Sequence, residues 1–226
     1  MKSDNGQKHL DYARLVRVCQ RDVEERRNAI LAEAASSSSR AVSVLDDGTV
    51  VLPSCAERKI ALVAHYDCVN GSYGYNDNGT GVVAILGMLD SLPANVEVVF
   101  TNGEERGSTG AKAYLASGAG GIAGCVNLDV CGCGERVYLD TMNFRCAGIV
   151  DAVCGDMPWN DGRVFMNHGI QSVCVSAGDG DDFRAGIAGI LETIHNNRMD
   201  NRLDAINFGV LPKVRKTVCE IIGMMS

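Results

Sequence analysis

The sequence of 226 residues has no long apolar run. A helix needs about 20 consecutive apolar residues to span a bilayer. The longest apolar segments of this chain are short ones such as Ile60 to Ala64. The segment from Met1 to Lys8 is polar, and no apolar stretch of signal-peptide length follows it. We therefore expect a soluble, cytoplasmic protein without a membrane partner.

An excess of basic residues is also missing. The chain has 21 Lys and Arg against 28 Asp and Glu, a net charge of -7, whereas nucleic-acid binders concentrate cations to contact phosphates. We expect no nucleic-acid partner. With 46% apolar and 22% charged residues, the composition is that of an ordinary globular protein, and we expect residues 1–226 to form one compact domain.

The ten cysteines do not form paired Cys-x-x-Cys elements. The short spacing of Cys131 and Cys133 does not supply a zinc site of four thiolates by itself. We interpret the cysteines as buried or surface thiols of a reducing compartment.

Alternating elements fill the rest of the chain. We expect an N-terminal helix at about residues 10–35, a small hairpin around Asp46 to Gly48, and a loop between Gly178 and Gly189. The other expected strands are 59–64, 96–101, 125–129, 136–140 and 172–176, and the other expected helices are 79–92, 109–116, 145–154 and 201–224. Strands that alternate with helices predict the α/β class, as a three-layer αβα sandwich with a mixed, mainly parallel sheet.

Polar side chains follow three successive strands where each strand ends. The first strand leads into His65, the second into Glu104 and Glu105, and the third into Asp129. The carboxyl ends of parallel strands share one edge of the sheet, and carboxylates that are buried together need a cation or another partner. A lone His65 is more often a hydrogen-bonded core residue, but the coincidence of the three strand ends favours a metal site.

Two further segments extend this set. Asp77 lies in the polar turn Asn76 to Gly81 at a helix entrance, where such a residue often serves as an N-cap. His195 precedes the expected terminal helix, with Asp200 five residues later.

In this order, the motifs resemble the co-catalytic dizinc exopeptidases, the superfamily of zinc aminopeptidases, glutamate carboxypeptidases and glutaminyl cyclases. The resemblance covers about Lys59 to Asp204 and includes His-x-Asp at residues 65–67, Asn-Asp-Asn at 76–78, Glu-Glu at 104–105 and Asn-Leu-Asp at 127–129. It implies the fold known as zinc aminopeptidase/phosphorylase-like. It also implies two Zn²⁺ ions, or another divalent metal, held by His65, Asp77, Glu105, Asp129 and His195.

The same resemblance assigns roles within the set. It implies that Asp77 bridges the ions, that Glu104 is the general base, that Asp67 orients the ring of His65, and that a cis peptide follows Asp77. Zinc suits imidazole and carboxylate ligands, and a base beside the ligands can move the proton of an attacking water. The sequence therefore predicts a metal-dependent hydrolase.

Some positions depart from the family pattern. Gly162 stands where a family histidine is expected, which leaves Asp161 and Phe165 as candidate substrate-binding residues. A terminal carboxylate would need an arginine, and Arg145, Arg163 and Arg184 are available. Because none of these lies in a motif, we favour an aminopeptidase that acts on short peptides.

The sequence leaves three alternatives to that activity: a glutaminyl cyclase-like acyltransferase with a single zinc, a carboxypeptidase, and a non-catalytic module that binds zinc or peptides. The presence of both His65 and Asp129 favours two metals and hydrolysis, and Glu104 favours catalysis because a structural zinc site needs no free carboxylate. The oligomeric state stays open.

Overall fold

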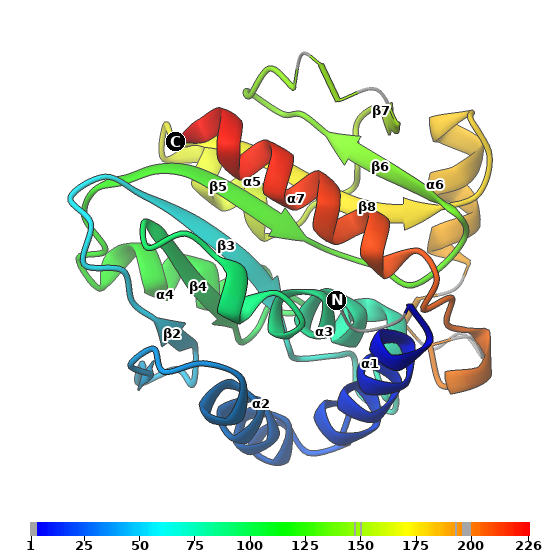
Figure 1. The fold of residues 1–226 in the computed structure, drawn as a ribbon, viewed down its shortest axis with the longest axis horizontal. Coiled ribbons are helices and arrows are strands. Elements are labelled where there is room, and N and C mark those ends of the chain that lie inside the picture. The colour runs from blue at the N-terminus through cyan, green and yellow to red at the C-terminus, as the bar shows by residue number, and fades with distance from the viewer. Residues whose placement is uncertain (1–3, 147, 150, 193, 196–199) are drawn as a thin grey trace.

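The computed structural model of the chain describes residues 4–146, 148–149, 151–192, 194–195 and 200–226. Its centre is an eight-stranded sheet in the order β1-β2-β4-β3-β5-β8-β6-β7 (Figure 1). The strands are β1 (Ser43–Val44), β2 (Val50–Leu52), β3 (Lys59–His65), β4 (Val96–Thr101), β5 (Ile122–Leu128), β6 (Arg136–Asp140), β7 (Ala152–Cys154) and β8 (Gln171–Gly178).

The four strands at the middle of the sheet, β4, β3, β5 and β8, are parallel to one another. Antiparallel pairs occur where β2 meets β4 and where β6 meets β8. In the register, His65 is opposite Thr101, and Leu128 is opposite Val175. The ends of β3, β4 and β5 therefore share one edge of the sheet, which is the edge that the sequence predicted for the site.

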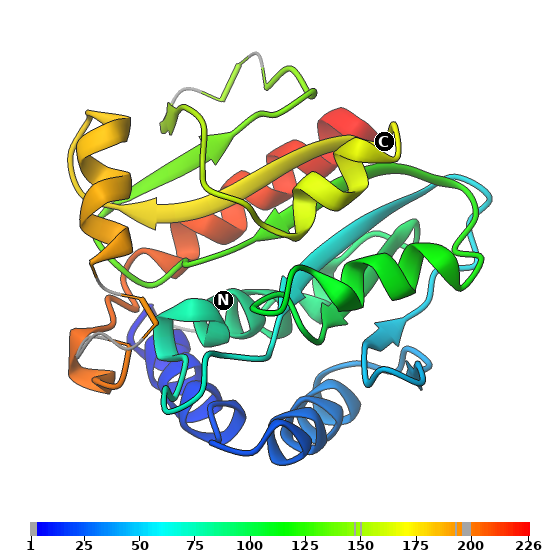
Figure 2. The same cartoon turned by 180° about the vertical axis from the view of Figure 1, so that it is seen from behind.

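Helices cover both faces of the sheet (Figure 2). On one face lie α1 (Asp4–Val18), α2 (Val23–Ser37), α3 (Thr80–Leu86) and α7 (Leu211–Met225), and on the other lie α4 (Thr109–Ala116), α5 (Asp161–Asn167) and α6 (Phe183–Leu191). Short turns of helix are η1 (Tyr75–Gly79), η2 (Leu89–Ser91) and η3 (Leu203–Ala205). The predicted αβα sandwich with a mixed, mainly parallel sheet is confirmed.

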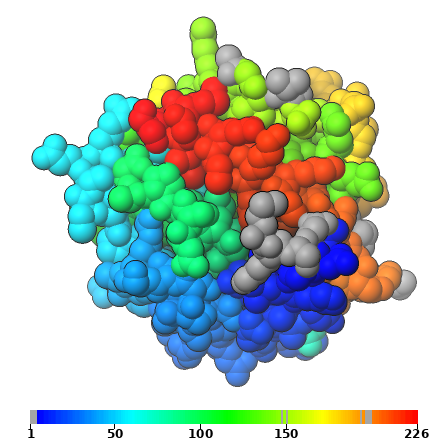
Figure 3. All heavy atoms as spheres, in the orientation of Figure 1, coloured from blue at the N-terminus to red at the C-terminus, as the bar shows by residue number. Residues whose placement is uncertain are grey.

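The larger core lies under α3 and α7. Apolar residues of β3 and β5 that point to this face, such as Leu62 and Val126, are fully buried with Val83 of α3 and Val218 of α7. The helices α1 and α2 pack on α3 from outside, and Figure 3 shows that they and α7 fill much of this face of the molecule. These helices thus hold the sheet on the face opposite to α4 and α5.

The expected single helix at residues 10–35 is wrong, because the structure has two helices there. The chain leaves the first after Val18, and the second begins at Val23. The side chain of Asp22 accepts hydrogen bonds from the amides of Glu24 and Glu25 and so caps α2. Asp often ends a helix by competing for amides in this way, although the segment contains no Gly or Pro.

Three other expected elements also differ. The segment expected to be a loop between Gly178 and Gly189 contains most of α6, which Asp182 caps by accepting from the amide of Ala185. The helix expected at residues 145–154 is wrong, because residues 152–154 form β7, which pairs with β6. The terminal helix begins at Leu211, with Pro212 in its first turn, and not at residue 201.

Candidate metal centre

The three strand ends bring a histidine and carboxylates together. The ring of His65 is 1% exposed, and its Nε2 atom lies 3.4 Å from Oδ1 of Asp129, which directly follows β5. The same Nε2 atom lies 3.2 Å from Oδ1 of Asp77. Suitable ligand atoms of these three residues all lie within 4.8 Å of one another, so they form a first candidate metal site.

A second set of atoms uses the other oxygen of Asp77. Nε2 of His195 lies 3.4 Å from Oδ2 of Asp77 and 3.5 Å from Oε2 of Glu105. These three residues also offer ligand atoms within 4.8 Å of one another. Asp77 belongs to both sets and contacts His65 and His195 through different oxygens, so it lies between the two candidate metal sites.

The polar turn around Asp77 is fixed by side chains that dock on the segment after β5. Asn78 donates to the carbonyl of Leu128 at 2.7 Å, and its Oδ1 accepts from the amide of Val130 at 3.3 Å. Asn76 accepts from the amide of Gly132 at 2.8 Å. The turn is thereby joined to the strand end that carries Asp129, and the peptide bond between Asp77 and Asn78 is cis, as the resemblance implied.

His195 and Asp200 approach the same turn from the C-terminal part of the chain; residues 196–199 between them lie outside the described residues. The side chain of His195 is 52% exposed. In contrast, Asp200 is 1% exposed and accepts hydrogen bonds from the amides of Asn76 and Asp77 at 2.9 and 3.0 Å, and from the hydroxyl of Ser72 at 2.5 Å. The carboxylate of Asp200 therefore holds the backbone of Asn76 and Asp77.

Asp67 supports both the histidine and the glutamate pair. Its Oδ1 atom lies 3.5 Å from Nδ1 of His65 and accepts from the amide of Glu104 at 3.1 Å. Its Oδ2 atom accepts from the amide of Glu105 at 3.3 Å. Burial opposes the charge of Asp67, but the hydrogen bonds from His65 and from the amides lower its pKa. Nδ1 of His65 lies closer still to the backbone carbonyl oxygen of Asp67, at 3.2 Å, so Asp67 contacts the ring through both its backbone and its carboxylate.

The donor set fits divalent cations, since imidazole and carboxylate are ligands that zinc accepts. Oε1 of Glu105 and Oδ1 of Asp129 are buried without a hydrogen-bond partner among the described residues. Burial and neighbouring carboxylates raise the pKa of Glu104 to about 9, that of Glu105 to about 8, and that of Asp129 above its ordinary value. Carboxylates crowded in this way are relieved by cations placed among them.

Asp161 and Phe165, the two candidate substrate-binding residues, both belong to α5 but differ in surroundings. Asp161 is fully buried and accepts a hydrogen bond from the hydroxyl of Thr101 at 2.5 Å. Burial raises the pKa of Asp161 to about 6, although His65 and Thr101 oppose the shift. Phe165 is also fully buried and packs on Tyr114, with ring centres 6.0 Å apart, so it belongs to the core behind the site.

An apolar pocket of about 120 Å³ opens beside the cluster. It contains Asp77, Glu104, Asp129 and His195, and its remaining wall is Val130, Met157, Pro158, Trp159, Asn160, Ile187, Ile190, Leu191 and Ile194. The sequence did not point to this wall, because α6 was expected to be a loop. The one signal available was the single tryptophan, whose side chain is held by a 3.0 Å hydrogen bond from its ring nitrogen to Ser108.

The arginines that the sequence offered for a substrate carboxylate line neither this pocket nor the cluster. Arg163 donates to Asp140 at 2.7 Å and to the carbonyl of Met157 at 2.8 Å, so its charge is already used. Arg145 and Arg184 are exposed at other places on the surface.

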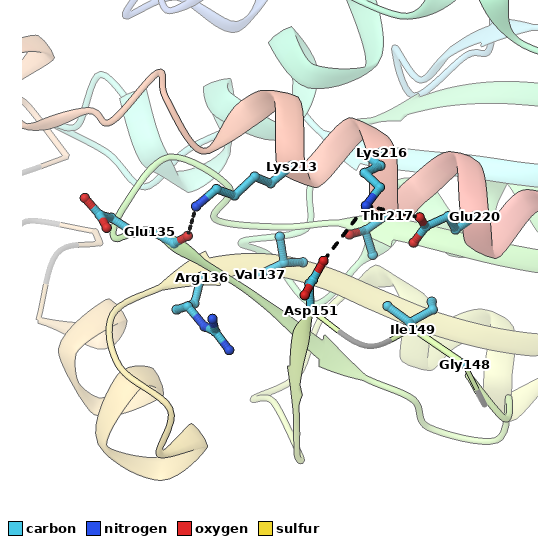
Figure 4. A pocket seen from close by; sticks show the side chains of 10 residues that line it. All are labelled: Glu135, Arg136, Val137, Gly148, Ile149, Asp151, Lys213, Lys216, Thr217 and Glu220. Carbon is cyan, nitrogen blue, oxygen red and sulfur yellow. Dashed lines mark hydrogen bonds and ion pairs between the residues drawn. The ribbon is translucent and has the colours of Figure 1, made fainter.

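Figure 4 shows another hollow, of about 380 Å³, between α7 and β6. It contains no member of the cluster. Lys213 donates to the carbonyl of Glu135 at 2.8 Å, and Lys216 lies 3.9 Å from Asp151 and 3.6 Å from Glu220. Because these charges are paired within the hollow, we assign it no part in the chemistry.

The structure therefore places two candidate metal sites at one edge of an α/β sheet. Residues 49–150 match the model of peptidase family M28. The structure is similar to that of the aminopeptidase LapA of Legionella pneumophila, with a TM-score of 0.74 and 13% identity, over 95% of this chain and 70% of the other. It is also similar to the glutaminyl cyclase of Porphyromonas gingivalis, with a TM-score of 0.69 and 15% identity, over 97% and 98% of the two chains. The resemblance to the co-catalytic zinc exopeptidases is thereby confirmed.

A curated relative, the vacuolar membrane protease of Pyrenophora tritici-repentis, is 30% identical over 133 residues, which cover 48% of this chain and 14% of that protein. The cytoplasmic location expected from the sequence is contradicted by this and similar relatives, which carry the same name. They also leave the expected absence of a membrane partner without support. Segments outside a catalytic domain can determine where a protein resides, so the composition of one domain says little about the cellular location of the protein. Among the described residues, no helix combines the length and apolar character needed to cross a membrane.

Proposed function

We propose that the chain is a zinc-dependent aminopeptidase that binds two zinc ions and releases N-terminal residues from peptides. The observation that carries this proposal is the placement of Asp77, which belongs to both candidate metal sites and lies beside His65 with one oxygen and beside His195 with the other. A single structural zinc has no need of a bridge, whereas two ions about 3.5 to 4 Å apart act together in hydrolysis. When bound, the ions would polarise the scissile carbonyl and make water more acidic.

In this proposal Glu104 is the general base. It directly precedes Glu105, and its side chain lines the apolar pocket but belongs to neither candidate metal site. Glu104 takes the proton of the attacking water and delivers it to the leaving amine. Asp67 keeps the amides of Glu104 and Glu105 in place and orients His65.

The apolar pocket binds the side chain of the first residue in this scheme. Its volume of about 120 Å³ and its wall of Ile, Leu, Met and Trp side chains suit an apolar side chain better than a charged one. Burial of such a side chain contributes about 1.5 to 3 kcal/mol. We therefore expect Leu and Met to be released faster than Asp or Lys.

A glutaminyl cyclase is the second candidate, because the P. gingivalis cyclase matches over nearly its whole length and the aminopeptidase over 70%. Trp159 beside the cluster would also suit the flat amide of a glutamine side chain. We prefer the aminopeptidase because both candidate metal sites have a full set of ligands.

A substrate panel with zinc tests the proposal: Leu-p-nitroanilide, N-acetyl-Leu-Ala, and a peptide with N-terminal Gln. We expect p-nitroaniline release that a chelator abolishes and that zinc restores, without hydrolysis of the acetylated peptide. Loss of ammonia from the Gln peptide without cleavage of Leu-p-nitroanilide would favour the cyclase. Cleavage of N-acetyl-Leu-Ala would favour a carboxypeptidase.

A further inference from the structure

A second hollow, of about 620 Å³, also reaches the candidate metal centre. It contains Asp67 and Glu105, whereas the apolar pocket contains Glu104, and the two hollows have no lining residue in common. They meet at the consecutive residues Glu104 and Glu105. A peptide that lies across the centre with its first side chain in the apolar pocket would therefore extend its following residues into this polar groove.

The polar groove is lined by three arginines, and the first of them builds its wall. Arg26 is 2% exposed and donates to the carbonyl oxygens of Gln20, Tyr66 and Tyr73. These bonds tie α2 to the segment after β3. The charge of Arg26 is surrounded by backbone oxygens and is not available to a ligand.

The other two arginines are exposed and have no carboxylate partner among the described residues. The guanidinium of Arg21 lies 4.8 Å from the ring centre of Tyr73, which positions it on the rim. Arg106 follows Glu105 directly, and no ion pair of its side chain occurs in the described part of the chain.

The carboxylates of the groove are engaged elsewhere. Asp22 accepts from two amides at the start of α2, Asp67 accepts from the amides of Glu104 and Glu105, and Glu105 belongs to a candidate metal site. The groove therefore presents two guanidinium groups that have no ion-pair partner among the described residues, on the side of the candidate metal centre where Glu105 lies. A guanidinium is well matched to a carboxylate, which it binds through two parallel hydrogen bonds.

We propose that Arg21 and Arg106 bind the C-terminal carboxylate of the substrate, so that the enzyme prefers peptides of two or three residues. This inference rests on the proposed aminopeptidase activity and adds a length preference to it. Each extended residue adds about 3.5 Å, so the carboxylate of a dipeptide or tripeptide cut at its first bond lies within reach of an arginine next to Glu105. A longer peptide would carry its carboxylate past this pair.

The test compares Leu-Ala and Leu-Ala-Ala with their C-terminal amides, in the wild type and in the double variant Arg21→Gln/Arg106→Gln. We expect the wild type to prefer the acids, and the ratio of kcat/KM for acid over amide to fall about 10-fold in the double variant, through KM. Arg58→Gln is the matched control, since Arg58 is an exposed arginine at the opposite end of β3, and it should leave the ratio as in the wild type.

A second measurement needs no variant. Added salt should raise the KM of the acids but not that of the amides, because exposed charge pairs are screened. Equal kinetics for acids and amides in the wild type, or a ratio that the double variant retains, would overturn the carboxylate site. Failure of the wild type to cleave any of the four peptides, acids and amides alike, would instead overturn the aminopeptidase activity.

Discussion

Glu104 differs from its neighbour Glu105 by position alone, because the chain turns after β4 so that Glu105 faces His195 and Glu104 faces the apolar pocket. The substitution Glu104→Gln keeps the size of the side chain but removes its ability to accept a proton. We expect activity to fall by roughly 10² to 10⁴ while bound zinc, measured by elemental analysis, stays at the wild-type level. Glu135→Gln, at an exposed site near α7, is the control. Unchanged turnover in Glu104→Gln would refute the assignment of the base.

Asp200 acts on the centre only through the backbone of Asp77 and its neighbour. Asp200→Asn removes the negative charge from the group that accepts from the two amides, so these hydrogen bonds weaken and the Asp77 carboxylate shifts. We expect zinc affinity to fall about 10-fold, in the range found when groups that hold metal ligands are changed, as measured by competition with a chromophoric chelator. Asp204→Asn, whose side chain is 70% exposed in a pair with Arg202, should bind zinc as the wild type does.

At the scale of elements, Glu97 joins β4 to three neighbours. Its carboxylate lies 2.9 Å from the ammonium of Lys59 on β3, accepts from the amide of Ser54 at 2.9 Å, and accepts from the hydroxyl of Tyr114 on α4. Burial raises the pKa of Glu97, but these three hydrogen bonds outweigh it and lower the pKa below the ordinary value. The carboxylate thus stabilises the fold in its ionised form.

The pH dependence follows from the sign of that shift. A lowered pKa in the folded state gives stability that is present above the ordinary glutamate pKa and is lost as the pH falls through the lower, folded value. We expect Glu97→Gln to lower the free energy of unfolding by about 2 kcal/mol at pH 7, with the difference from the wild type shrinking below pH 4. Urea denaturation at both pH values measures this, with the exposed Glu57→Gln as control. A constant difference between the two pH values would contradict this account.

The helix α6 was expected to be a loop, yet it lines the apolar pocket beside the candidate metal centre. Its Gly-rich sequence and the acidic residues before it are typical of a loop, yet Ile187, Ile190 and the facing Tyr138 bury apolar surface that holds the helix on β6 and β8. The same helix supplies a wall of the apolar pocket that we propose binds the substrate. Tertiary packing overrides weak local preferences in such segments.

At the scale of the molecule, we treat residues 1–226 as one domain whose two faces share a single sheet. We expect one cooperative thermal transition, and a rise in its midpoint when zinc is added at 100 times its dissociation constant. Binding at that excess contributes about 2.7 kcal/mol, which corresponds to roughly 5 to 10 °C for a chain of this size.

Calorimetry with and without a chelator measures this rise. Asp77→Asn is the informative variant, because it weakens both candidate sites together and should lose most of the shift. Two separated transitions in the wild type would contradict the single domain. An equal rise in Asp77→Asn would contradict the role of Asp77 as a bridge.

The central strands of the sheet, and the edge on which His65, Glu104, Glu105 and Asp129 meet, could be predicted from the sequence alone. Each of these residues follows a buried strand, and the carboxyl ends of parallel strands share an edge whatever the details of packing. The motif around Asp77 was also readable, because its asparagines act locally to fix a turn.

The other features around the centre depend on tertiary contacts. Tertiary packing brings Asp200 to a turn more than 120 residues earlier in the chain and makes α6 a wall of the apolar pocket. It also brings Arg21, from the turn between α1 and α2, into the same groove as Arg106. Such contacts leave no local pattern, because they depend on how helices pack on the sheet and on each other. Most residues of the candidate metal centre therefore follow the ends of strands. The residues that we propose select the substrate come from segments that only folding brings to these strand ends.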